Sequence, residues 1–224
     1  GGAIGCELAQ VFSRLGVRVE LFEQAPRLLP LEIPLAGEIL AQSLVDSGVR
    51  LHLGEAVTSI EGAGTIHTSN GTVVCEKIML AAGRKPNIES LNLGSAGVGL
   101  DSRGFIAVDE KLRTTKKHIY AAGDCATTLQ FTHHADAQAR ALIQNALFLP
   151  TAKVSGLAVP HCTYTSPEIA SIGPSLDALD STGVAYDRYE FDLTELDRVK
   201  AKPFTSVEKS KAHGGYALVV TAKG

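Results

Sequence analysis

The sequence starts with GGAIGCELAQVFSRLG at residues 1–16, a glycine-rich turn followed by apolar residues at helical spacing. In the dinucleotide turn G-x-G-x-x-G, the first glycine makes the tight turn and the second lets the backbone approach the pyrophosphate. The third lets the helix pack closely on the strand. Gly2 and Gly5 match the second and third positions, and the first would lie one residue before Gly1. The stretch therefore predicts a dinucleotide turn whose preceding strand lies outside the chain.

An acidic residue follows at the spacing of an adenosine-binding site. VRVELFE at residues 17–23 is β-rich and mostly apolar, which predicts a strand that ends near Glu23. A carboxylate at that position accepts hydrogen bonds from the adenosine ribose and repels a 2′-phosphate, so it favours NAD. Arg27 keeps NADP as the less favoured alternative. Glycines, helix, strand and acid together favour a dinucleotide site over an ordinary α/β turn with a solvated glutamate.

The pattern beyond this point is that of a doubly wound α/β protein. Apolar spacing predicts a helix over 35–47 and a strand over 49–53, and strands are expected again at 78–83 and 118–126. Three β-rich segments and an Asn70-Gly71 turn predict an antiparallel meander from residue 56. An Ala-rich helix is expected over 134–147 and a linker over 150–160. The elements expected beyond it are a helix near 175–181 and strands over 185–191 and 216–220.

Composition excludes several classes of protein. The 224 residues have a formal net charge of −3, which argues against a nucleic-acid or anionic-membrane surface. No apolar run reaches the roughly 20 residues that span a bilayer. Four cysteines without a CxxC pair favour a reduced, cytoplasmic protein over a metal site or a disulfide framework. Both ends of the chain look internal to a longer protein, so a targeting signal is left open.

Three further positions are candidates for binding. Glu7 lies one residue inside the expected helix start, where the helix dipole favours a carboxylate, and it could equally be an ordinary helix acid. Asp124 ends HIYAAGDCA and could bind a ribose or polyol, or simply belong to a turn. Thr132 is expected to cap the Ala-rich helix, whose N-terminus suits a developing anion. His133 and His134 have no third partner at metal-ligand spacing.

Together these stretches resemble the FAD-dependent pyridine nucleotide–disulfide oxidoreductases, the group of dihydrolipoamide dehydrogenase and mercuric reductase. The matching segments occur in the family's order over nearly the whole chain: GGAIGCELAQVFSRLG, VELFEQAPRLLP, LAAGRKPN, HIYAAGDCA, QFTHHADAQARALIQNALF and CTYTSPEIASIG. The resemblance implies a Rossmann-like NAD(P) domain with a meander at 1–85. It further implies the C-terminal part of an FAD domain at 86–155 and the start of an α+β dimerisation domain at 156–224.

The resemblance also implies roles for individual residues. Gly2 and Gly5 would contact the NAD pyrophosphate, Glu23 the adenosine ribose, and Glu7 would lie near the nicotinamide. Val57 would flank the adenine, and Gly83 would let the nicotinamide approach. Asp124 would bind the ribityl chain of FAD. The backbone donors near the flavin pyrimidine edge would come from Gln130, Phe131, Thr132 and His133.

The resemblance predicts a homodimeric flavoprotein that passes reducing equivalents between NAD(P)H, FAD and a redox dithiol. Its substrate would be a small or protein-bound disulfide, or mercuric ion. The family's redox C-x4-C pair and its C-terminal His and Glu are not in this sequence, so we expect no catalytic residue here and no turnover by this chain alone. An NADH oxidase, a coenzyme A-disulfide reductase and a non-catalytic NAD module are the alternatives. The stretch AKPFTSVEKSKAHGGYALVV at 201–220 is looser than the family pattern.

Overall fold

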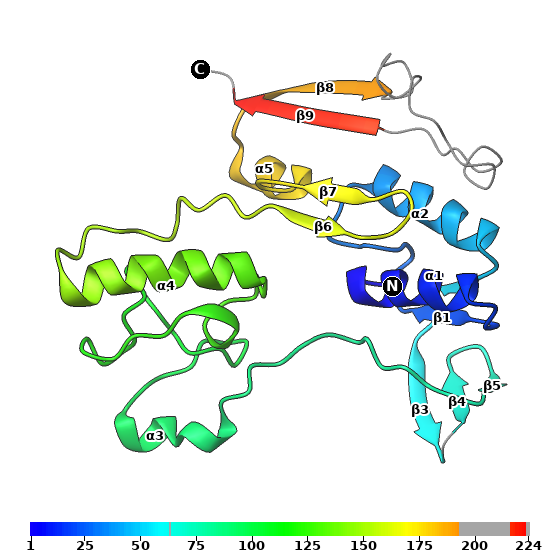
Figure 1. Ribbon diagram of the computed structural model, residues 1–224, viewed down its shortest axis with the longest axis horizontal. Helices are drawn as coiled ribbons and strands as arrows, with labels where there is room; N and C mark the ends of the chain where they lie inside the picture. The colour runs from blue at the N-terminus through cyan, green and yellow to red at the C-terminus, as the bar shows by residue number, and fades with distance from the viewer. Residues whose placement is uncertain (63, 193–215, 223–224) are drawn as a thin grey trace. The chain divides into compact units, whose positions relative to one another are not determined.

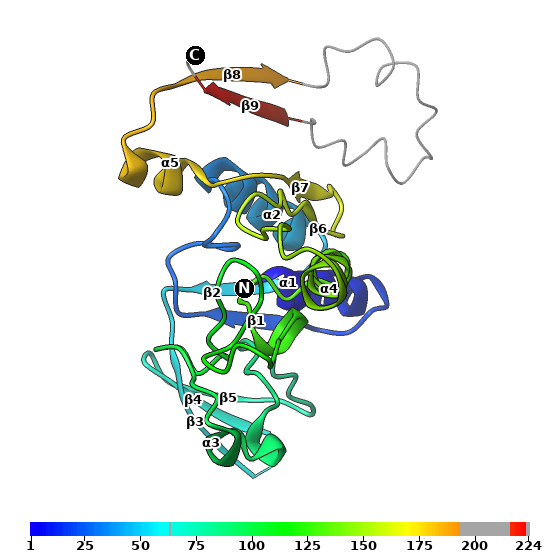
Figure 2. The same ribbon diagram turned by 90° about the vertical axis from the view of Figure 1, so that its left-hand side faces the viewer.

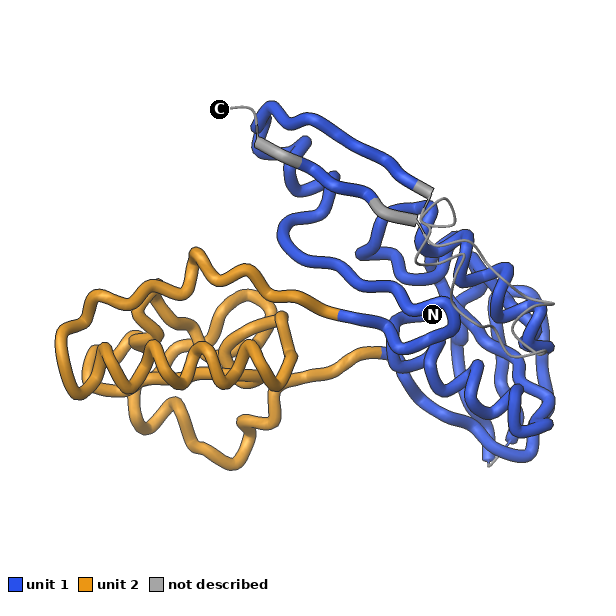
Figure 3. Tube along the Cα trace, turned by 45° about the horizontal axis from the view of Figure 1, so that its top comes forward, with its two compact units in different colours: residues 1–82, 162–224 blue, residues 83–161 orange. Residues whose placement is uncertain are grey.

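A computed structural model describes residues 1–62, 64–192 and 216–222. The chain forms two compact units (Figure 3). Unit 1 contains residues 1–82 together with the chain from 162 onward, and unit 2 contains residues 83–161. Residues 201–215, which belong to the stretch that is looser than the family pattern, lie outside the described residues. The domain boundaries expected from the sequence stay a prediction.

Unit 1 is built around a β–α–β arrangement (Figure 1). Helix α1 (Ala3–Arg14) starts directly after Gly2 and leads to strand β1 (Glu20–Glu23), helix α2 (Pro34–Asp46) and strand β2 (Arg50–Leu53). The two strands are parallel, with Glu20 opposite Arg50 and Glu23 opposite Leu53. A parallel pair requires a crossover, and α2 provides it. The helices and strands predicted in this region are therefore present within three residues of their expected bounds.

One apolar core holds this arrangement together. Leu40 and Leu44 of α2 are fully buried against Cys6 and Ala9 of α1, Leu21 of β1 and Val49 before β2. Leu28 and Leu29 of the β1–α2 loop complete the cluster. Gly37 lets α2 approach that loop, because a Cβ at this position would lie 2.5 Å from the carbonyl oxygen of Leu28. The strand end that carries Glu23 is thus fixed by packing from both helices.

The rest of unit 1 consists of strands and one short helix. Strands β3 (Val57–Glu61), β4 (Thr65–Thr68) and β5 (Thr72–Val74) form the predicted antiparallel meander. Strands β6 (His161–Thr163) and β7 (Ile169–Ser171) pair, and helix α5 (Leu176–Thr182) follows. Figure 2 shows the long antiparallel hairpin of β8 (Tyr186–Asp192) and β9 (Tyr216–Ala222). The predicted helix near 175–181 and both predicted strands after it are present.

Unit 2 has little regular structure apart from one long helix. It contains the short helical turns η1 (Glu89–Leu91) and η2 (Gly123–Cys125), helix α3 (Leu93–Ala96) and helix α4 (Thr132–Leu147). Its core is a small cluster of Ile88, Val98, Ile106 and Ala121. Asp109 accepts hydrogen bonds from two backbone N–H groups and forms an ion pair with Arg113 at 2.8 Å, which ties the loop together.

Two predicted strands are absent, and the predicted helix cap is wrong. Residues 78–83 form no strand, and residues 118–126 contribute a single bridge, between Tyr120 and Arg113. A strand needs a neighbour to complete its ladder, and no described strand lies beside either segment. Thr132 was expected to cap α4, but Phe131 occupies the N-cap position and Thr132 is the first helical residue, with no side-chain cap.

The fully buried Leu44 supplies a test of the core. Replacing Leu44 with Ala leaves a cavity between the two helices, and we expect the free energy of unfolding to fall by about 2–5 kcal/mol in urea denaturation. Val45, its neighbour on α2, is 52% exposed. The matched change Val45→Ala should therefore cost less than about 1 kcal/mol. Equal losses for the two variants would show that this core does not hold the unit.

Candidate dinucleotide and flavin sites

The glycine turn and Glu23 are in direct contact. The Gly1 backbone nitrogen lies 3.1 Å from Glu23 Oε2. A Cβ at Gly1 would lie 2.6–2.8 Å from three atoms of the Glu23 side chain, which is closer than a side chain tolerates. The Gly1 carbonyl oxygen accepts hydrogen bonds from Leu29 N at 2.9 Å and from Cys6 Sγ at 3.3 Å. Burial raises the pKa of the Cys6 thiol to about 11, so the thiol keeps the proton that it donates.

Gly2 and Gly5 differ in their surroundings. A Cβ at Gly2 would meet nothing within 4 Å, and the residue has φ −75°, so the turn itself does not require glycine there. Open space beside Gly2, at the N-terminus of α1, suits an approaching pyrophosphate. Gly5 is buried, and a Cβ there would lie 3.6 Å from the Cβ of Ala81. The helix therefore runs close to the 78–83 segment, and the packing of Gly5 against the strand before the turn stays a prediction.

Glu23 is held as a carboxylate at the end of β1. Burial by itself would raise the pKa of Glu23, but hydrogen bonds outweigh it and lower the pKa. The strongest of them is the 2.8 Å bond from Ala25 N to Oε1, and the charged amino group of Gly1, the first residue of the chain, adds a hydrogen bond and a positive charge. An ionised carboxylate beside a glycine turn accepts ribose hydroxyl hydrogen bonds and opposes a 2′-phosphate.

The Arg27 side chain forms hydrogen bonds with the loop after β1. Its Nη1 donates to the carbonyl oxygens of Leu29 at 3.1 Å and Glu32 at 2.8 Å, and its Nη2 donates to that of Pro30 at 2.7 Å. The guanidinium thus closes the loop after β1. This geometry weakens the argument from sequence that Arg27 would bind the phosphate of NADP.

Glu7 lies in the second turn of α1, which corrects its expected position near the helix start. The helix begins at Ala3 and has no acidic residue in its first turn. Glu7 Oε1 instead accepts a 2.8 Å hydrogen bond from Tyr164 N. Gln10, one turn further, is buried, accepts from Ser166 N at 2.8 Å and donates to the Ser166 carbonyl oxygen at 3.1 Å. These bonds attach the β6–β7 segment to α1, and neither Gln10 nor Ser166 was a candidate from the sequence.

Val57 and Gly83 are placed at segment ends. Val57 is the first residue of β3 and is 45% exposed, so its side chain is available to a ligand. Gly83 is the first residue of unit 2 and has φ +115°, a conformation that strongly favours glycine. A Cβ there would meet nothing within 4 Å. The predicted contacts of these residues with NAD stay predictions.

The predicted flavin residues lie in two neighbouring segments of unit 2. Asp124 belongs to η2, and Gln130 to His133 surround the start of α4. Gln130 Nε2 lies 3.4 Å from the Asp124 carbonyl oxygen, and the Gln130 carbonyl oxygen accepts from Arg84 at 2.9 Å. Gly123 has φ +77°, and a Cβ there would lie 3.2 Å from that of Ala135, so η2 packs closely on α4. With no side-chain cap on α4, the first-turn N–H groups suit acceptor oxygens of a ligand.

Two sets of side-chain contacts surround the start of α4: stacked rings and a hydrogen-bonded Gln–His pair. Phe131 stacks with His133 and with His161, each at a centroid distance of 5.5 Å. Gln138 Oε1 accepts from Gly123 N at 2.7 Å, so its amide nitrogen must donate to His134 Nε2, 3.0 Å away. His134 is therefore neutral with its proton on Nδ1, in agreement with a pKa lowered by burial. Among the described residues, no group forms a hydrogen bond with the buried His134 Nδ1. The His134 side chain thus adds no positive charge beside the start of α4.

Other kinds of site have less support. A cavity of about 410 Å³ in unit 2 has His134 and Gln138 in its wall, but not Asp124 or residues 130–133, so it is not the predicted flavin site. Among the described residues, no three His, Cys, Asp or Glu side chains converge as metal ligands. No described helix is long and apolar enough to cross a membrane.

A parallel β–α–β unit with a glycine turn beside a strand-end carboxylate is the arrangement that many dinucleotide-binding α/β proteins use. The family model of the pyridine nucleotide-disulphide oxidoreductases matches residues 1–139. The chain belongs to this family.

Named relatives agree with the family. The chain is 38% identical over 229 residues to a mercuric reductase of Bacillus cereus, covering 99% of this chain and 35% of that protein. It is 31% identical over 227 residues to a dihydrolipoyl dehydrogenase of Chlamydia muridarum, covering 99% and 46%. The crystal structure of LpdA from Mycobacterium tuberculosis is 30% identical with a TM-score of 0.77, covering 89% of this chain and 44% of that one. The chain thus spans less than half the length of these proteins, and it has the α/β fold of that structure.

Gly2 offers a test that separates folding from binding. Asp is among the best N-cap residues and there is space for it, so Gly2→Asp should leave the unfolding midpoint unchanged or raise it. The added charge would repel the pyrophosphate, and we expect the Kd for NAD⁺ in calorimetry to rise at least about tenfold. Gly2→Asn is the uncharged control and should lose less affinity. Unchanged NAD⁺ binding by Gly2→Asp would exclude this turn as the pyrophosphate site.

Proposed function

We propose that this chain is the NAD-binding part and an adjoining FAD-binding part of a flavoprotein disulfide oxidoreductase. The observation that carries the proposal is the contact between the Gly1–Gly2 turn and the ionised Glu23, with α1 starting directly after the turn. Unit 1 up to residue 82 would be a Rossmann-like NAD domain with its meander. Unit 2 would be the returning half of the FAD domain, and the β6 to β9 segment would begin the dimerisation domain of a homodimer.

Different residues would bind the two cofactors. The N-terminus of α1 and Glu23 would orient NADH by its pyrophosphate and adenosine ribose. Asp124, whose carboxylate has no partner among the described residues, would bind the ribityl chain of FAD, and the uncapped start of α4 would face the flavin's acceptor edge. Bound FAD supplies the chemistry that links hydride transfer from NADH to reduction of a cysteine pair. The protein's contribution here is binding and orientation.

The substrate follows from the relatives. The two curated relatives described above are a mercuric reductase and a dihydrolipoyl dehydrogenase. We propose a disulfide of the lipoamide kind or mercuric ion as the oxidant or product of the complete protein, with the redox cysteines supplied by sequence outside this chain.

Expression of the complete reading frame tests the function. The purified protein should be yellow, NADH should bleach its flavin absorbance, and lipoamide or mercuric ion should restore it. The 224-residue chain alone should show no diaphorase activity. A complete protein that neither retains nor takes up FAD, or whose bound flavin NADH does not reduce, would refute the proposal.

Cofactor preference provides a further prediction. The complete protein should prefer NADH, and Glu23→Ala should raise the relative kcat/KM for NADPH by about tenfold because the repelling carboxylate is gone. Arg27→Ala should leave the preference within about twofold, since its guanidinium is bound to loop carbonyls. A large loss of NADPH use in Arg27→Ala would instead show that Arg27 reaches the 2′-phosphate.

A further inference from the structure

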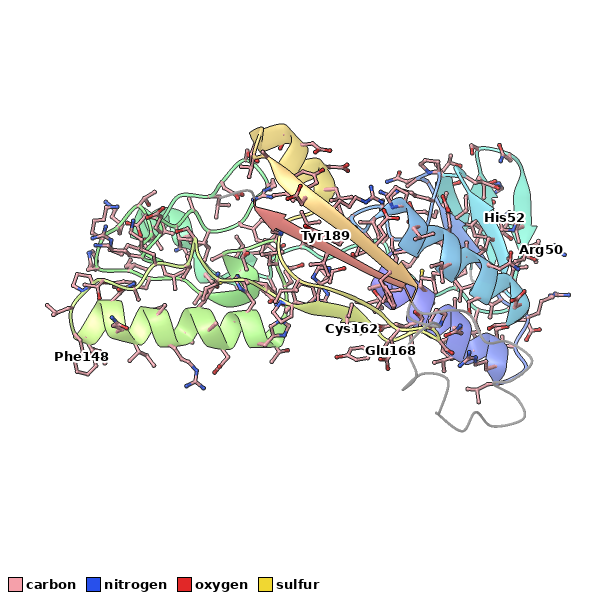
Figure 4. All side chains as sticks on the ribbon, turned by 90° about the horizontal axis from the view of Figure 1, so that it is seen from above. Arg50, His52, Phe148, Cys162, Glu168 and Tyr189 are labelled. Carbon is pink, nitrogen blue, oxygen red and sulfur yellow. The ribbon has the colours of Figure 1, made fainter. Side chains whose placement is uncertain are left out.

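A group of polar side chains lies beside the adenosine end of the predicted NAD site. His52 of β2 has Nε2 3.0 Å from Glu20 Oε2 and Nδ1 3.2 Å from Glu55 Oε2. Its ring stacks on Phe22 at a centroid distance of 4.3 Å, and Arg50, labelled with His52 in Figure 4, pairs with Glu20 at 3.5 Å. None of these residues was a candidate from the sequence.

Glu55 is the most enclosed member of the group. It is only 9% exposed, and its Oε1 accepts a short hydrogen bond from Thr68 Oγ1. Thr68 Oγ1 in turn accepts from Asn70 N at 3.2 Å and Gly71 N at 3.1 Å, so the carboxylate fastens the whole β4–β5 turn. The Thr68 hydroxyl is the main reason that the pKa of Glu55 is lowered. A buried carboxylate with these partners is costly to disturb.

The backbone of Glu55 reaches the ribose-binding side. Glu55 N donates to the Glu23 carbonyl oxygen at 3.0 Å, and Gly54 N donates to that of Ala25 at 2.9 Å. The chain that carries Glu23 is thus joined directly to the residue that carries the buried carboxylate.

The side chain of Glu55 reaches the adenine side. Thr68 is the partner of Val57 in the β3–β4 register, and Ser69 N donates to the Ala56 carbonyl oxygen at 3.0 Å. The carboxylate therefore holds Val57 through the strand opposite it. Glu55 is the one described residue bonded both to Glu23 and to the partner strand of Val57.

We propose that Glu55 is a positioning residue for the adenosine half of NAD. Resting on the proposed function, it sets the spacing between the ribose acceptor Glu23 and the adenine-flanking Val57, without touching the ligand itself. Glu55 would not position the nicotinamide half of the ligand. Loss of Glu55 should therefore weaken the binding of ligands whose adenosine occupies the NAD site and spare nicotinamide ligands that lack adenosine.

The test compares two ligands in the complete flavoprotein. ADP-ribose keeps the adenosine half, the pyrophosphate and the second ribose and lacks only the nicotinamide ring, whereas reduced nicotinamide mononucleotide lacks the adenosine half. For Glu55→Ala we expect the Kd of ADP-ribose and the KM of NADH to rise about tenfold. The kcat at saturating NADH, the flavin spectrum and the KM for the mononucleotide should stay within about twofold.

Further variants guard against a simple folding defect. Glu55→Gln keeps an acceptor for Thr68 and should lose only about threefold in ADP-ribose affinity. Thr68→Val should resemble Glu55→Ala, and the double variant should be no worse than the poorer single one, because the two groups act as a pair. The control Glu61→Gln removes the charge of the exposed Glu61, which pairs with His67 in the same meander, and should change nothing.

Each outcome decides a different question. ADP-ribose binding within twofold of the parent in Glu55→Ala, or an equal loss in Glu61→Gln, overturns the positioning role, as does a parent protein that does not bind ADP-ribose. A parent that shows the expected ADP-ribose pattern but contains no reducible flavin upholds the positioning role and refutes the proposed function.

Discussion

The contact between Gly1 and Glu23 is the constraint on which the predicted binding site depends. Only a residue without a side chain fits at position 1, because a Cβ would overlap the Glu23 side chain. The same glycine uses its carbonyl oxygen to hold Leu29 of the β1–α2 loop and the Cys6 thiol of α1. One residue therefore contacts the first helix, the end of the strand and the loop that follows it.

This constraint explains why the charges around the site are arranged as they are. In the loop after β1, the Arg27 guanidinium donates hydrogen bonds to three backbone carbonyl oxygens, those of Leu29, Pro30 and Glu32. Partial burial opposes ionisation of Glu23, but the Ala25 N–H and the positively charged Gly1 amino group outweigh it and lower the pKa of the carboxyl. The result is a negative strand end with its nearest arginine engaged, which suits a ribose with free hydroxyls better than one with a phosphate.

Local sequence patterns predicted much of unit 1 and the long helix of unit 2. Helical apolar spacing located α1 and α2, the Ala-rich composition located α4, and the Asn70-Gly71 turn located the meander, because these signals lie within a few residues of one another. The strands expected at 78–83 and 118–126 depend on neighbours distant in sequence, and they are absent where no described strand pairs with them. The bonds from Gln10 to Ser166 span 156 positions, and no local pattern indicates them. The sequence did not indicate a role for Glu55 for the same reason, because that role depends on its hydrogen bonds to both Glu23 and Thr68.

A crystal structure of the complete protein with NAD⁺ tests the central claim most directly. The account predicts the pyrophosphate over Gly2 at the N-terminus of α1, with the adenosine ribose hydroxyls on the Glu23 carboxylate. NAD⁺ bound away from this turn, or with its adenosine ribose out of reach of Glu23, would contradict it.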